Sequence, residues 1–479
     1  MVERSPMMEK IAIVGSGDLA ARVARSCEKL GIATLTLFDP AGLPPHYYSN
    51  PEQSVPIEGL REHGPLAIAA VIEAAKASGA QAVYPATPLF GARIALSQAV
   101  SEAGLIFIGS APDALARMHD RVALRELARI AGVRTIPASE GPLPEDEQEL
   151  LAIARTLGLP LRIKPALIDP STDAAIATVE ELGDLPAALK RSRAALNALP
   201  EGSPGRDTAL FLEQEIDRPR VLLVPVLVDK FGDSLALPER ESSVRRGDLV
   251  LIDESPAPAL RGLPQSELKR QTLLDTAARI ALESGAIGAL CVEFLLDSDQ
   301  RLHVHALRPG LFGAVGATEM STGRDLAEAQ IRLAAGEHLL ATYRDRPIAG
   351  HAIEARVRTE ATPHNPALGP KPDAIRALRW PPVVPGAMRI EASLATGVVI
   401  APEDELLIAS VVTYGQTRHQ AFLTLDRVLS ETTIEPIVCN LRLLRDILGD
   451  ESYRAGQYDT GFVDRLLKEL RTPQVKEAS

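Results

Sequence analysis

The chain has 479 residues, too many for one compact core, so we expect roughly two to four domains. Its composition, 46% apolar and 24% charged, is typical of a soluble globular protein, and its formal net charge of −12 argues against nucleic acid or a membrane as a partner. The sequence has no run of about 18 apolar residues and no signal-peptide pattern, which predicts a cytoplasmic protein. Three isolated cysteines, Cys27, Cys291 and Cys439, are expected to be reduced thiols.

The first part of the chain alternates strands and helices, as a parallel α/β domain does. A strand at Lys10–Val14 leads into the glycine-rich turn Gly15–Ala20, a helix through about Leu30, and a strand at Ala33–Phe38 that ends at Asp39. This order matches the dinucleotide fingerprint, in which glycines let a pyrophosphate approach a helix N-terminus. A structural role is favoured, because any doubly wound domain needs a tight first turn and nothing downstream supplies hydride chemistry. Further helices are predicted at Leu66–Ser78, Ala92–Ala103, Pro112–Met118 and Arg121–Ala131, and further strands at Gln81–Tyr84 and Leu105–Ile108.

A polar, proline-containing stretch at Ser139–Gln148 predicts a hinge. Beyond it we expect a helix at Glu149–Leu157, a polar and mostly helical stretch at Thr178–Asn197, and a long amphipathic helix at Gln265–Ser284. Strands are expected at Leu161–Lys164, Ala209–Glu215, Arg220–Val228, Glu239–Ser243 and Leu249–Asp253, and a further helix at Asp325–Ala335. The residues from Ala349 onward are predicted to form a mixed α/β tail.

The stretch Gly288–Glu319 predicts two strands, Ala289–Leu296 and Arg301–Leu307, joined by a polar turn and followed by a glycine-rich loop. In a nucleotide-dependent ligase such a hairpin carries two or more carboxylates, because Mg²⁺ takes oxygen ligands in octahedral geometry. Here the strands carry one, Glu293, and residues 306–317 contain no Asp or Glu. The sequence therefore predicts the hairpin of a magnesium site with only one of the two expected carboxylate ligands.

A resemblance to a known family is carried, in order, by the segments CEKLGIATLTL, AGLIFIGSAPDALARMHDRVALRELARIAGV, FLEQEIDRPR, DESPAPAL, GALCVEFLL, IRLAAGEHL and GHAIEAR. The chain resembles the biotin carboxylase subunit of acyl-CoA carboxylases from about Met8 to about Leu470. The resemblance implies an α/β protein with the ATP-grasp fold of biotin carboxylase type. Its implied parts are a Rossmann-like N-terminal domain at 1–138, a mobile lid at 139–209, an ATP-grasp core at 210–348, and a C-terminal α/β domain at 349–479 that completes the active site and the dimer.

The resemblance also implies roles for the residues that match the family's motifs. Lys164 stands at the lid lysine, Glu213 at the adenine-side hinge, Glu293 at the first metal ligand and Arg389 at the biotin-side arginine. Arg121 and Gln214 replace two family lysines, one that reaches phosphates and one in the hinge. A possible ATP site therefore comprises Lys164, Arg121, Glu213, Gln214 and Ile216, with Glu293 as the residual metal ligand and Arg389 as the only matched biotin-side residue.

Many of the family's functional groups are missing. The glycine run that covers the ATP phosphates reads Pro165–Pro170 here, where prolines remove N–H donors and Asp169 adds negative charge. The resemblance implies that the family's second metal-binding glutamate corresponds to Ala306 and the nearby asparagine to Arg308. The arginine and glutamate that act on bicarbonate and biotin correspond to Gly310 and Ala314. The family's His-Gln-Lys motif falls near residues 247–249. The HPGYGFLSE-like loop reads YPATPLFG at 84–91.

These losses predict a catalytically inactive protein to which magnesium is not expected to bind. Removal of one preorganised electrostatic group typically costs about 10²–10³ in rate, and about five such groups are gone together. A cation at Arg308 also opposes Mg²⁺, because two unit charges about 4 Å apart at an effective dielectric near 20 repel by roughly 4 kcal/mol. We hypothesise that Arg308 pairs with Glu293 across the hairpin and takes the role of the metal. The alternative is a solvated or snorkelling Arg308.

Other ionisable residues have weaker functional interpretations. His303 and His305 are two apart on a strand and are expected to share a face. Because no third ligand is spaced correctly, they indicate surface or packed histidines rather than a metal site. Asp18 and Asp39 could bind a ribose, although turn and strand-end roles are favoured. The Arg245-Arg246 pair could bind an anion, although a solvated pair is more common.

Three functions remain open. The favoured one is an inactive structural or regulatory subunit of a biotin-dependent acyl-CoA carboxylase, without covalent biotin on this chain. It would form a homodimer, or pair with an active biotin carboxylase, a biotin carrier protein or a carboxyltransferase. The alternative is an ATP-dependent biotin carboxylase or another ATP-grasp ligase with a divergent active site, supported by Lys164, Glu213 and Glu293. A third is a sensor in which Lys164 and the hinge Glu213–Ile216 hold a nucleotide without magnesium.

Overall fold

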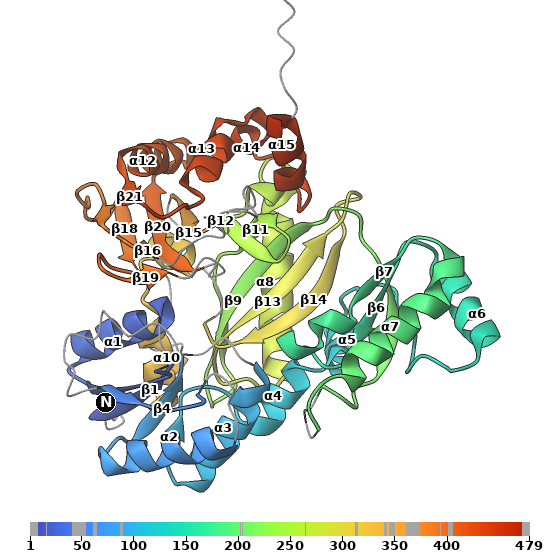
Figure 1. Ribbon diagram of the computed structural model, residues 1–479, viewed down its shortest axis with the longest axis horizontal. Coiled ribbons are helices and arrows are strands. Elements are labelled where there is room, and N and C mark those ends of the chain that lie inside the picture. Colours follow the sequence, from blue (N-terminus) through green and yellow to red (C-terminus); the bar gives the residue numbers. More distant parts are fainter. Residues whose placement is uncertain are drawn as a thin grey trace, which may run out of the picture.

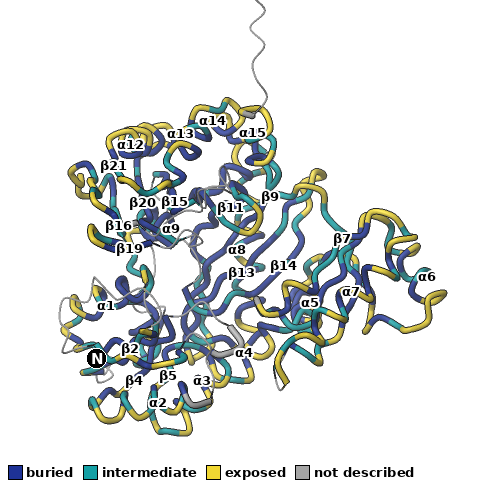
Figure 2. The backbone as a smooth tube through the Cα atoms, in the orientation of Figure 1, coloured by how far each residue is buried: buried dark blue, intermediate teal, exposed yellow. Residues whose placement is uncertain are grey.

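The computed structural model describes residues 8–15, 17–40, 54–60, 65–86, 90–201, 203, 205–263, 265–311, 315–339, 343, 350–360, 373–392, 394–400 and 406–471. Sheets flanked by helices organise this part of the chain (Figure 1). Figure 2 shows that the central strands are mostly buried, whereas exposed residues lie on the outer helices and turns. Within these ranges, no helix combines the length and apolar character that crossing a bilayer requires.

The N-terminal sheet has five parallel strands in the order β3-β2-β1-β4-β5. Its strands are β1 (Lys10–Val14), β2 (Ala33–Phe38), β3 (Ser54–Pro56), β4 (Ala82–Pro85) and β5 (Ile106–Phe107). The helices of this part are α1 (Asp18–Leu30), α2 (Pro65–Ala77), α3 (Phe90–Glu102), α4 (Pro112–Met118) and α5 (Arg121–Ile130). Strand β1 is central because Ile11, Ala12, Ile13 and Val14 are all buried, as a parallel strand covered on both faces must be. The predicted parallel α/β arrangement is confirmed.

A small antiparallel sheet, in the order β7-β6-β8, lies in the arm that extends to the right in Figure 1. Its elements are α6 (Glu147–Leu157), β6 (Leu161–Pro165), η2 (Pro170–Ala175), β7 (Ala177–Val179), η3 (Leu182–Asp184), α7 (Leu185–Asn197) and β8 (Leu210–Gln214). The expectation of mostly helical structure from Thr178 is wrong at its start, since Thr178 pairs with Arg162 of β6. A strand of three residues is too short to show a period in the sequence.

The central sheet has nine strands, with β14-β13-β9-β11-β12-β15-β20-β18 as its main path and β10 paired to β9. Its strands are β9 (Arg220–Val228), β10 (Ser234–Ala236), β11 (Arg240–Arg246), β12 (Leu249–Ser255), β13 (Gly288–Leu296), β14 (Leu302–Pro309), β15 (His351–Arg358), β18 (Met388–Ala392) and β20 (Leu407–Gly415). The chain between them forms η4 (Pro258–Leu260), α8 (Ser266–Glu283), α9 (Gly316–Thr322) and α10 (Leu326–Ala334). The sheet continues from β12 into β15, so the boundary expected between residues 348 and 349 does not separate two sheets.

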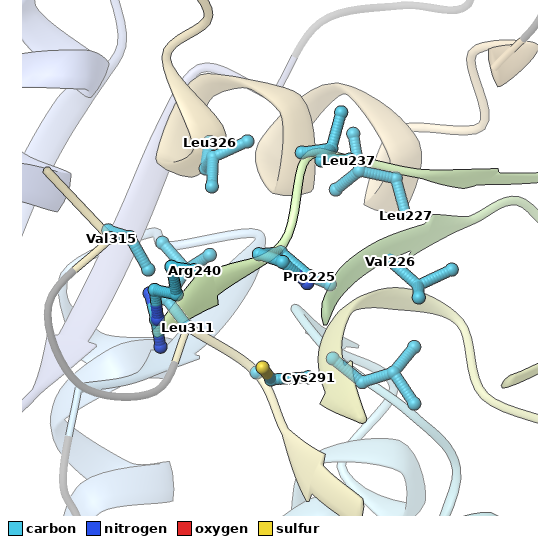
Figure 3. A pocket seen from close by; sticks show the side chains of 12 residues that line it. Pro225, Val226, Leu227, Leu237, Arg240, Cys291, Leu311, Val315 and Leu326 are labelled. Carbon is cyan, nitrogen blue, oxygen red and sulfur yellow. The ribbon is translucent and has the colours of Figure 1, made fainter. Parts of the chain in front are cut away.

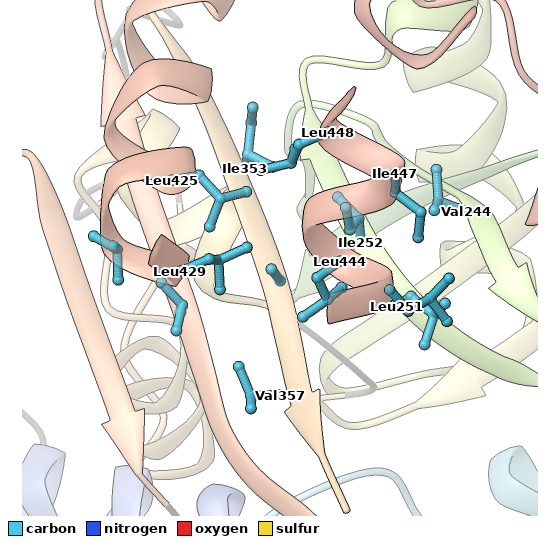
Figure 4. Close-up of a cluster of buried hydrophobic side chains, with 14 of the residues drawn as sticks. Val244, Leu251, Ile252, Ile353, Val357, Leu425, Leu429, Leu444, Ile447 and Leu448 are labelled. Carbon is cyan, nitrogen blue, oxygen red and sulfur yellow. The ribbon is translucent and has the colours of Figure 1, made fainter. Parts of the chain in front are cut away.

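The C-terminal part covers one end of this sheet with helices. Its remaining elements are β16 (Asp373–Ala374), β17 (Ala377–Arg379), β19 (Val399–Ile400), α12 (Arg418–Glu431), β21 (Thr433–Glu435), α13 (Leu441–Gly449), α14 (Glu451–Ala455) and α15 (Phe462–Arg471). Figure 4 shows Leu425 of α12 near Ile353 of β15, and Ile447 of α13 near Val244 and Ile252 of the neighbouring strands; Leu429 and Leu444 belong to the same buried cluster. Each fully buried aliphatic side chain stabilises this contact by about 1.5–3 kcal/mol.

Candidate functional site

The hairpin of β13 and β14 lies at one edge of the central sheet, and it contains the predicted ion pair. Nε and Nη2 of Arg308 each lie 3.2 Å from Oε2 of Glu293. The side chain of Glu293 is 8% exposed and that of Arg308 is 23% exposed, so the alternative of a solvated Arg308 is wrong. Burial alone raises the pKa of the Glu293 carboxyl, but Arg308, His305 and Arg245 outweigh burial and hold that pKa at about 2.

A second ion pair lies between two strands of the small sheet. Lys164 of β6 and Glu213 of β8 form a salt bridge, and their side chains are only 6% and 12% exposed. Burial raises the pKa of the Glu213 carboxyl, but Lys164 outweighs it and lowers that pKa. Two residues that were expected to face a nucleotide therefore neutralise each other.

A β-bulge in β14 places His305 beside these pairs. Glu293 is paired in register with Ala306, whereas the next residue, Phe294, is paired with Val304. His305 is therefore the extra residue of the bulge, without a partner on β13. Bulges of this kind re-aim a side chain and occur often beside functional sites.

The bulge separates the two histidines that were expected to share a face. His303 contacts Asp297, with Nε2 2.8 Å from Oδ2, whereas His305 lies near Glu293 and Lys164. Burial lowers the pKa of His305 to about 4, so its imidazole is neutral at pH 7. The Nδ1 atom of His305 is buried and has no hydrogen-bond partner in the described part of the chain. The expectation of a common face is thus wrong, because the bulge changes the alternation.

The loop after Lys164 uses its backbone N–H groups inside the protein. The bonds run from Ala166 N to Ala209 O (2.7 Å), from Leu167 N to Thr208 Oγ1 (3.0 Å) and from Ile168 N to His119 O (2.7 Å). The Oδ1 atom of Asp169 accepts from the N–H of Ser171 at the start of η2. The donors that would cover phosphates in a glycine-rich loop are therefore engaged elsewhere.

The remaining residues of the predicted nucleotide site lie on α5 and at the end of β8. Arg121 begins α5, and its Nε donates to the carbonyl of Pro165 at 3.0 Å. No carboxylate oxygen of the described residues lies within 4.0 Å of that guanidinium. Gln214 follows Glu213 on the strand, so its side chain lies on the opposite face. The N–H of Ile216 has no acceptor among the described residues.

Arg389 of β18 belongs to a different cluster. Its Nη2 lies 2.7 Å from Glu319 and its Nε lies 3.2 Å from Glu391. Arg22 of α1 forms ion pairs with the same two carboxylates. The matched biotin-side residue is therefore held in a largely buried network that joins α1, α9 and β18, and none of its ion pairs involves Glu293.

The surroundings of Gly310, where the resemblance places a bicarbonate-binding arginine, are filled. Gly310 has a φ of +78°, and a Cβ atom there would lie 3.1 Å from Nη1 of Arg93, a buried residue that donates to Pro309 O at 2.6 Å. Two cavities border Gly310, and each leaves about 10 Å³ for the centre of a water molecule, roughly what one water needs. Figure 3 shows one of them, surrounded by mostly apolar side chains and Arg240. Neither cavity accommodates bicarbonate. Ala314 lies outside the described residues.

Sequence reasoning missed the roles of Arg93 and Arg22. Arg93 is the only charged residue in the first eleven positions of α3, FGARIALSQAV, and Arg22 lies on the buried face of α1. A charged residue inside an apolar helical face is the signal that points to a buried polar partner. The partners themselves, the carbonyl of Pro309 for Arg93 and the carboxylates of Glu319 and Glu391 for Arg22, come from distant segments.

The residues present do not fit magnesium. Mg²⁺ demands near-ideal octahedral coordination by oxygen atoms, and the hairpin offers the single carboxylate of Glu293, whose Oε2 accepts two hydrogen bonds from Arg308. In the described ranges, no three His, Cys, Asp or Glu side chains are grouped so that they could hold a metal ion. No metal-dependent step follows from these residues.

The parallel N-terminal sheet, the small antiparallel sheet and the central antiparallel sheet with its carboxylate-bearing hairpin define an ATP-grasp protein. Residues 7–115 match the N-terminal domain of biotin carboxylase, residues 120–342 the ATP-binding domain of the carbamoyl-phosphate synthase L chain, and residues 354–465 the C-terminal domain of biotin carboxylase. The chain belongs to the biotin carboxylase family.

Two relatives and one solved structure are similar to this chain over nearly its whole length. A biotin carboxylase of Nostoc sp. is 30% identical over 462 residues, which cover 96% of this chain and 99% of that protein. The biotin carboxylase of Pseudomonas aeruginosa is 29% identical over 464 residues, with coverages of 96% and 99%. The biotin carboxylase domain dimer of Hydrogenobacter thermophilus 2-oxoglutarate carboxylase, solved with MgADP, ADP and bicarbonate, is 24% identical with a TM-score of 0.84 and coverages of 96% and 98%. The predicted family and fold are confirmed.

Proposed function

We propose that this chain is a catalytically inactive member of the biotin carboxylase family that serves as a structural or regulatory subunit of a biotin-dependent acyl-CoA carboxylase. The observation that carries the proposal is the ion pair of Arg308 with Glu293, because a guanidinium beside this carboxylate would oppose a divalent cation there. Activation of bicarbonate by ATP requires metal-bridged phosphates and positioned charges. A guanidinium can neutralise Glu293, but it cannot bridge phosphates in octahedral geometry.

Two further features support the absence of turnover. The N–H groups of Ala166, Leu167 and Ile168 are bonded within the protein, which leaves them unavailable to phosphates. A Cβ atom at Gly310 would lie 3.1 Å from Nη1 of Arg93, so a side chain there would be crowded by that guanidinium. The phosphate cover and the bicarbonate site are thus altered independently of the metal site.

The proposal includes the organisation of the subunit. We propose the boundaries 1–138, 139–209, 210–348 and 349–479, and a cytoplasmic location. The Hydrogenobacter domain is a dimer, which supports a homodimer or a heterodimer with an active biotin carboxylase. The remaining partners that we propose are a carboxyltransferase and a biotin carrier protein, which would bear the biotin because we propose none on this chain.

The second candidate is an active ATP-dependent biotin carboxylase or another ATP-grasp ligase with a divergent site. It is favoured by relatives that are themselves named biotin carboxylase and that match the chain from end to end. It is also favoured by the presence of Lys164, Glu213 and Glu293. Under this alternative, substrate binding would have to separate Arg308 from Glu293 and recruit magnesium.

The test is an assay of ATP hydrolysis by the purified full chain, with magnesium and bicarbonate, in the presence and absence of free biotin. The biotin carboxylase of Nostoc sp. in the same assay is the positive control, and circular dichroism verifies that the chain is folded. We expect no biotin-stimulated turnover. Stimulated turnover above that of a buffer blank would overturn the proposal and establish the second candidate.

A further inference from the structure

The arm that contains the small antiparallel sheet is bonded to the N-terminal part of the chain through the protein's own backbone (Figure 1). We propose that a strap, defined as residues Pro165–Asp169, keeps this arm shut against the start of α5 in the ligand-free protein. Any ligand or partner that needs the arm open must first break the strap. The inference goes beyond the proposed function, because it concerns the conformation of the arm and not turnover.

The first argument is a pair of backbone hydrogen bonds between the strap and the turn before α5. The N–H of Arg121 donates to the carbonyl of Ala166 at 2.9 Å, and the N–H of Ile168 donates to the carbonyl of His119 at 2.7 Å. Ile168 and His119 are buried, with exposed fractions of 7% and 2%. A hydrogen bond away from water is stronger than an exposed one, because water does not compete for its donor and acceptor. The contact involves the main chain, so no change of rotamer releases it.

The side chain of Arg121 reinforces this contact. Its Nε donates to the carbonyl of Pro165 at 3.0 Å, so one residue holds two successive carbonyls of the strap. The next N–H groups of α5, those of Val122 and Ala123, donate to Oδ1 of the N-cap residue Asp120 at 2.7 and 3.3 Å. A helix N-terminus has N–H groups without partners inside the helix. At the start of α5 the strap and the N-cap satisfy these groups without a ligand.

On its other side the strap is bonded to the arm itself. The N–H groups of Ala166 and Leu167 donate to the carbonyl of Ala209 (2.7 Å) and to Oγ1 of Thr208 (3.0 Å). The strap would therefore move together with the arm. The two bonds to the turn before α5 are the ones that an opening movement breaks, so they report whether the arm is open or shut.

The segment that connects α5 to the arm is also bonded on two sides. The N–H of Val304 in β14 donates to the carbonyl of Arg134 at 3.1 Å, and the N–H of Gln214 in β8 donates to the carbonyl of Pro137 at 2.8 Å. Rotation within such a segment would leave backbone groups without partners on one side or the other, which is unfavourable. The connection thus favours the orientation in which the strap meets α5.

The experiment is hydrogen exchange of the full chain in buffer without nucleotide or metal, read by mass spectrometry at single-residue resolution. The N–H of Ala166 is the internal reference, because its bond lies within the arm. We expect the protection factors of Arg121 and Ile168 to lie within about tenfold of that reference, and to change less than about twofold when ATP and magnesium are added. Protection more than about tenfold below the reference, or protection that appears only with ATP, would overturn the inference.

A substitution removes the side-chain part of the contact. Arg121→Ala keeps the backbone N–H but loses the bond from Nε to Pro165, so the protection factor of Ile168 should fall by at least about threefold. The matched control is Arg129→Ala at the other end of α5, where the pair with Glu126 is 74% and 54% exposed and protection should not change. Wild-type protection of Ile168 in Arg121→Ala, or an equal fall in the control, contradicts the strap.

A designed disulfide tests the contact without removal of an arginine, and it decides the question if Arg121→Ala does not fold. Asp120 and Leu167 face each other as a non-hydrogen-bonded antiparallel pair, in which Cα atoms lie about 4.5 Å apart and a disulfide fits. Asp120→Cys with Leu167→Cys should cross-link under mild oxidation without nucleotide, as shown by peptide mapping. The control pair is Arg129→Cys with Leu167→Cys, since residue 129 lies about two turns further along α5 and should not cross-link. Cross-linking only with ATP, or as slowly as in the control, overturns the inference.

The two proposals fail separately. Biotin-stimulated turnover overturns the inactive subunit, whereas the strap is judged from exchange and cross-linking without any ligand. An unprotected Ile168 in a chain without turnover overturns only the strap.

Discussion

Replacement of Arg308 by alanine should destabilise the protein strongly, because the Glu293 carboxylate then remains buried without its partner. Glu293 is 8% exposed, and Arg308 donates both hydrogen bonds that its Oε2 accepts. Removal of one partner from a buried ion pair typically costs about 3–5 kcal/mol. Since the Arg308 side chain is 23% exposed, we expect a loss of about 2–4 kcal/mol in the free energy of unfolding near neutral pH.

The loss of unfolding free energy caused by Arg308→Ala should be smaller in acid. The direction of this pH dependence follows from the pKa of Glu293. In the wild type that pKa is about 2, so the contribution of the pair is complete above the unfolded-state pKa and disappears as the pH falls through about 2. Arg308 is the largest of the influences that lower the pKa of Glu293, so we expect that pKa to rise in the variant, with a penalty at neutral pH that is relieved when the carboxyl takes up a proton. The difference between the variant and the wild type should therefore be larger at about pH 7 than at about pH 5.

The assay is urea unfolding followed by circular dichroism at both pH values. The control is Arg301→Ala, which removes an ion pair of the same hairpin whose side chains are 56% and 64% exposed, and which should cost at most about 1 kcal/mol. Adding Glu293→Gln to Arg308→Ala should recover part of the stability, because no unpaired charge then remains. Equal losses for Arg308→Ala and Arg301→Ala, or no recovery in the double variant, would refute the reasoning.

Two further substitutions test the site and the C-terminal part. Gly310→Arg should destabilise the protein by about 1–3 kcal/mol and restore no bicarbonate-dependent turnover, because the φ of +78° and the 3.1 Å approach to Arg93 oppose any side chain. Thermal unfolding measures the stability and the ATP assay measures the turnover. A stable, active variant would contradict this prediction. Arg418→Ala should lower the free energy of unfolding by about 3–5 kcal/mol and make the C-terminal helices susceptible to limited proteolysis. The reason is that Arg418 donates hydrogen bonds to both carboxylate oxygens of buried Glu254 (2.7 and 2.8 Å) and to the carbonyl of Tyr453. Arg418→Lys should recover only part of this loss, since a lysine cannot bond in bidentate fashion, and complete recovery would argue against the geometry.

The sequence was sufficient to predict those features that depend on short-range pattern. Strand Arg220–Val228 has the predicted bounds, and the hairpin of β13 and β14 lies within about two residues of its prediction, because long apolar runs bounded by turn residues identify buried strands. The pair of Arg308 with Glu293 was also predictable. Its two members lie on adjacent strands of one hairpin, so their proximity follows from the turn.

Features that depend on one extra residue or on distant segments were not predictable. The bulge at His305 shifts the pairing of β14 with β13 by one residue, and no residue type in LHVHALRP predicts it. The engagement of the N–H groups after Lys164 needs acceptors from the turn after α4 and from the segment before β8, which only the fold brings together. The ion pairs of Arg389 likewise require α1 and α9, which are far away in the sequence.

The fold around the hairpin does not depend on the charged residues of a metal site for its stability. The sheet around the hairpin is stabilised by buried aliphatic side chains such as Val292 and Leu307, whose contribution does not depend on a metal. An alanine at 306 leaves no unpaired group, but the retained Glu293 is a buried carboxylate that requires a cation. Arg308 meets that requirement from the facing strand. For the same reason, a metal site of the kind that the resemblance implies would need changes at both 306 and 308. A second carboxylate alone would share the one guanidinium with Glu293, and removal of Arg308 alone would leave Glu293 uncompensated.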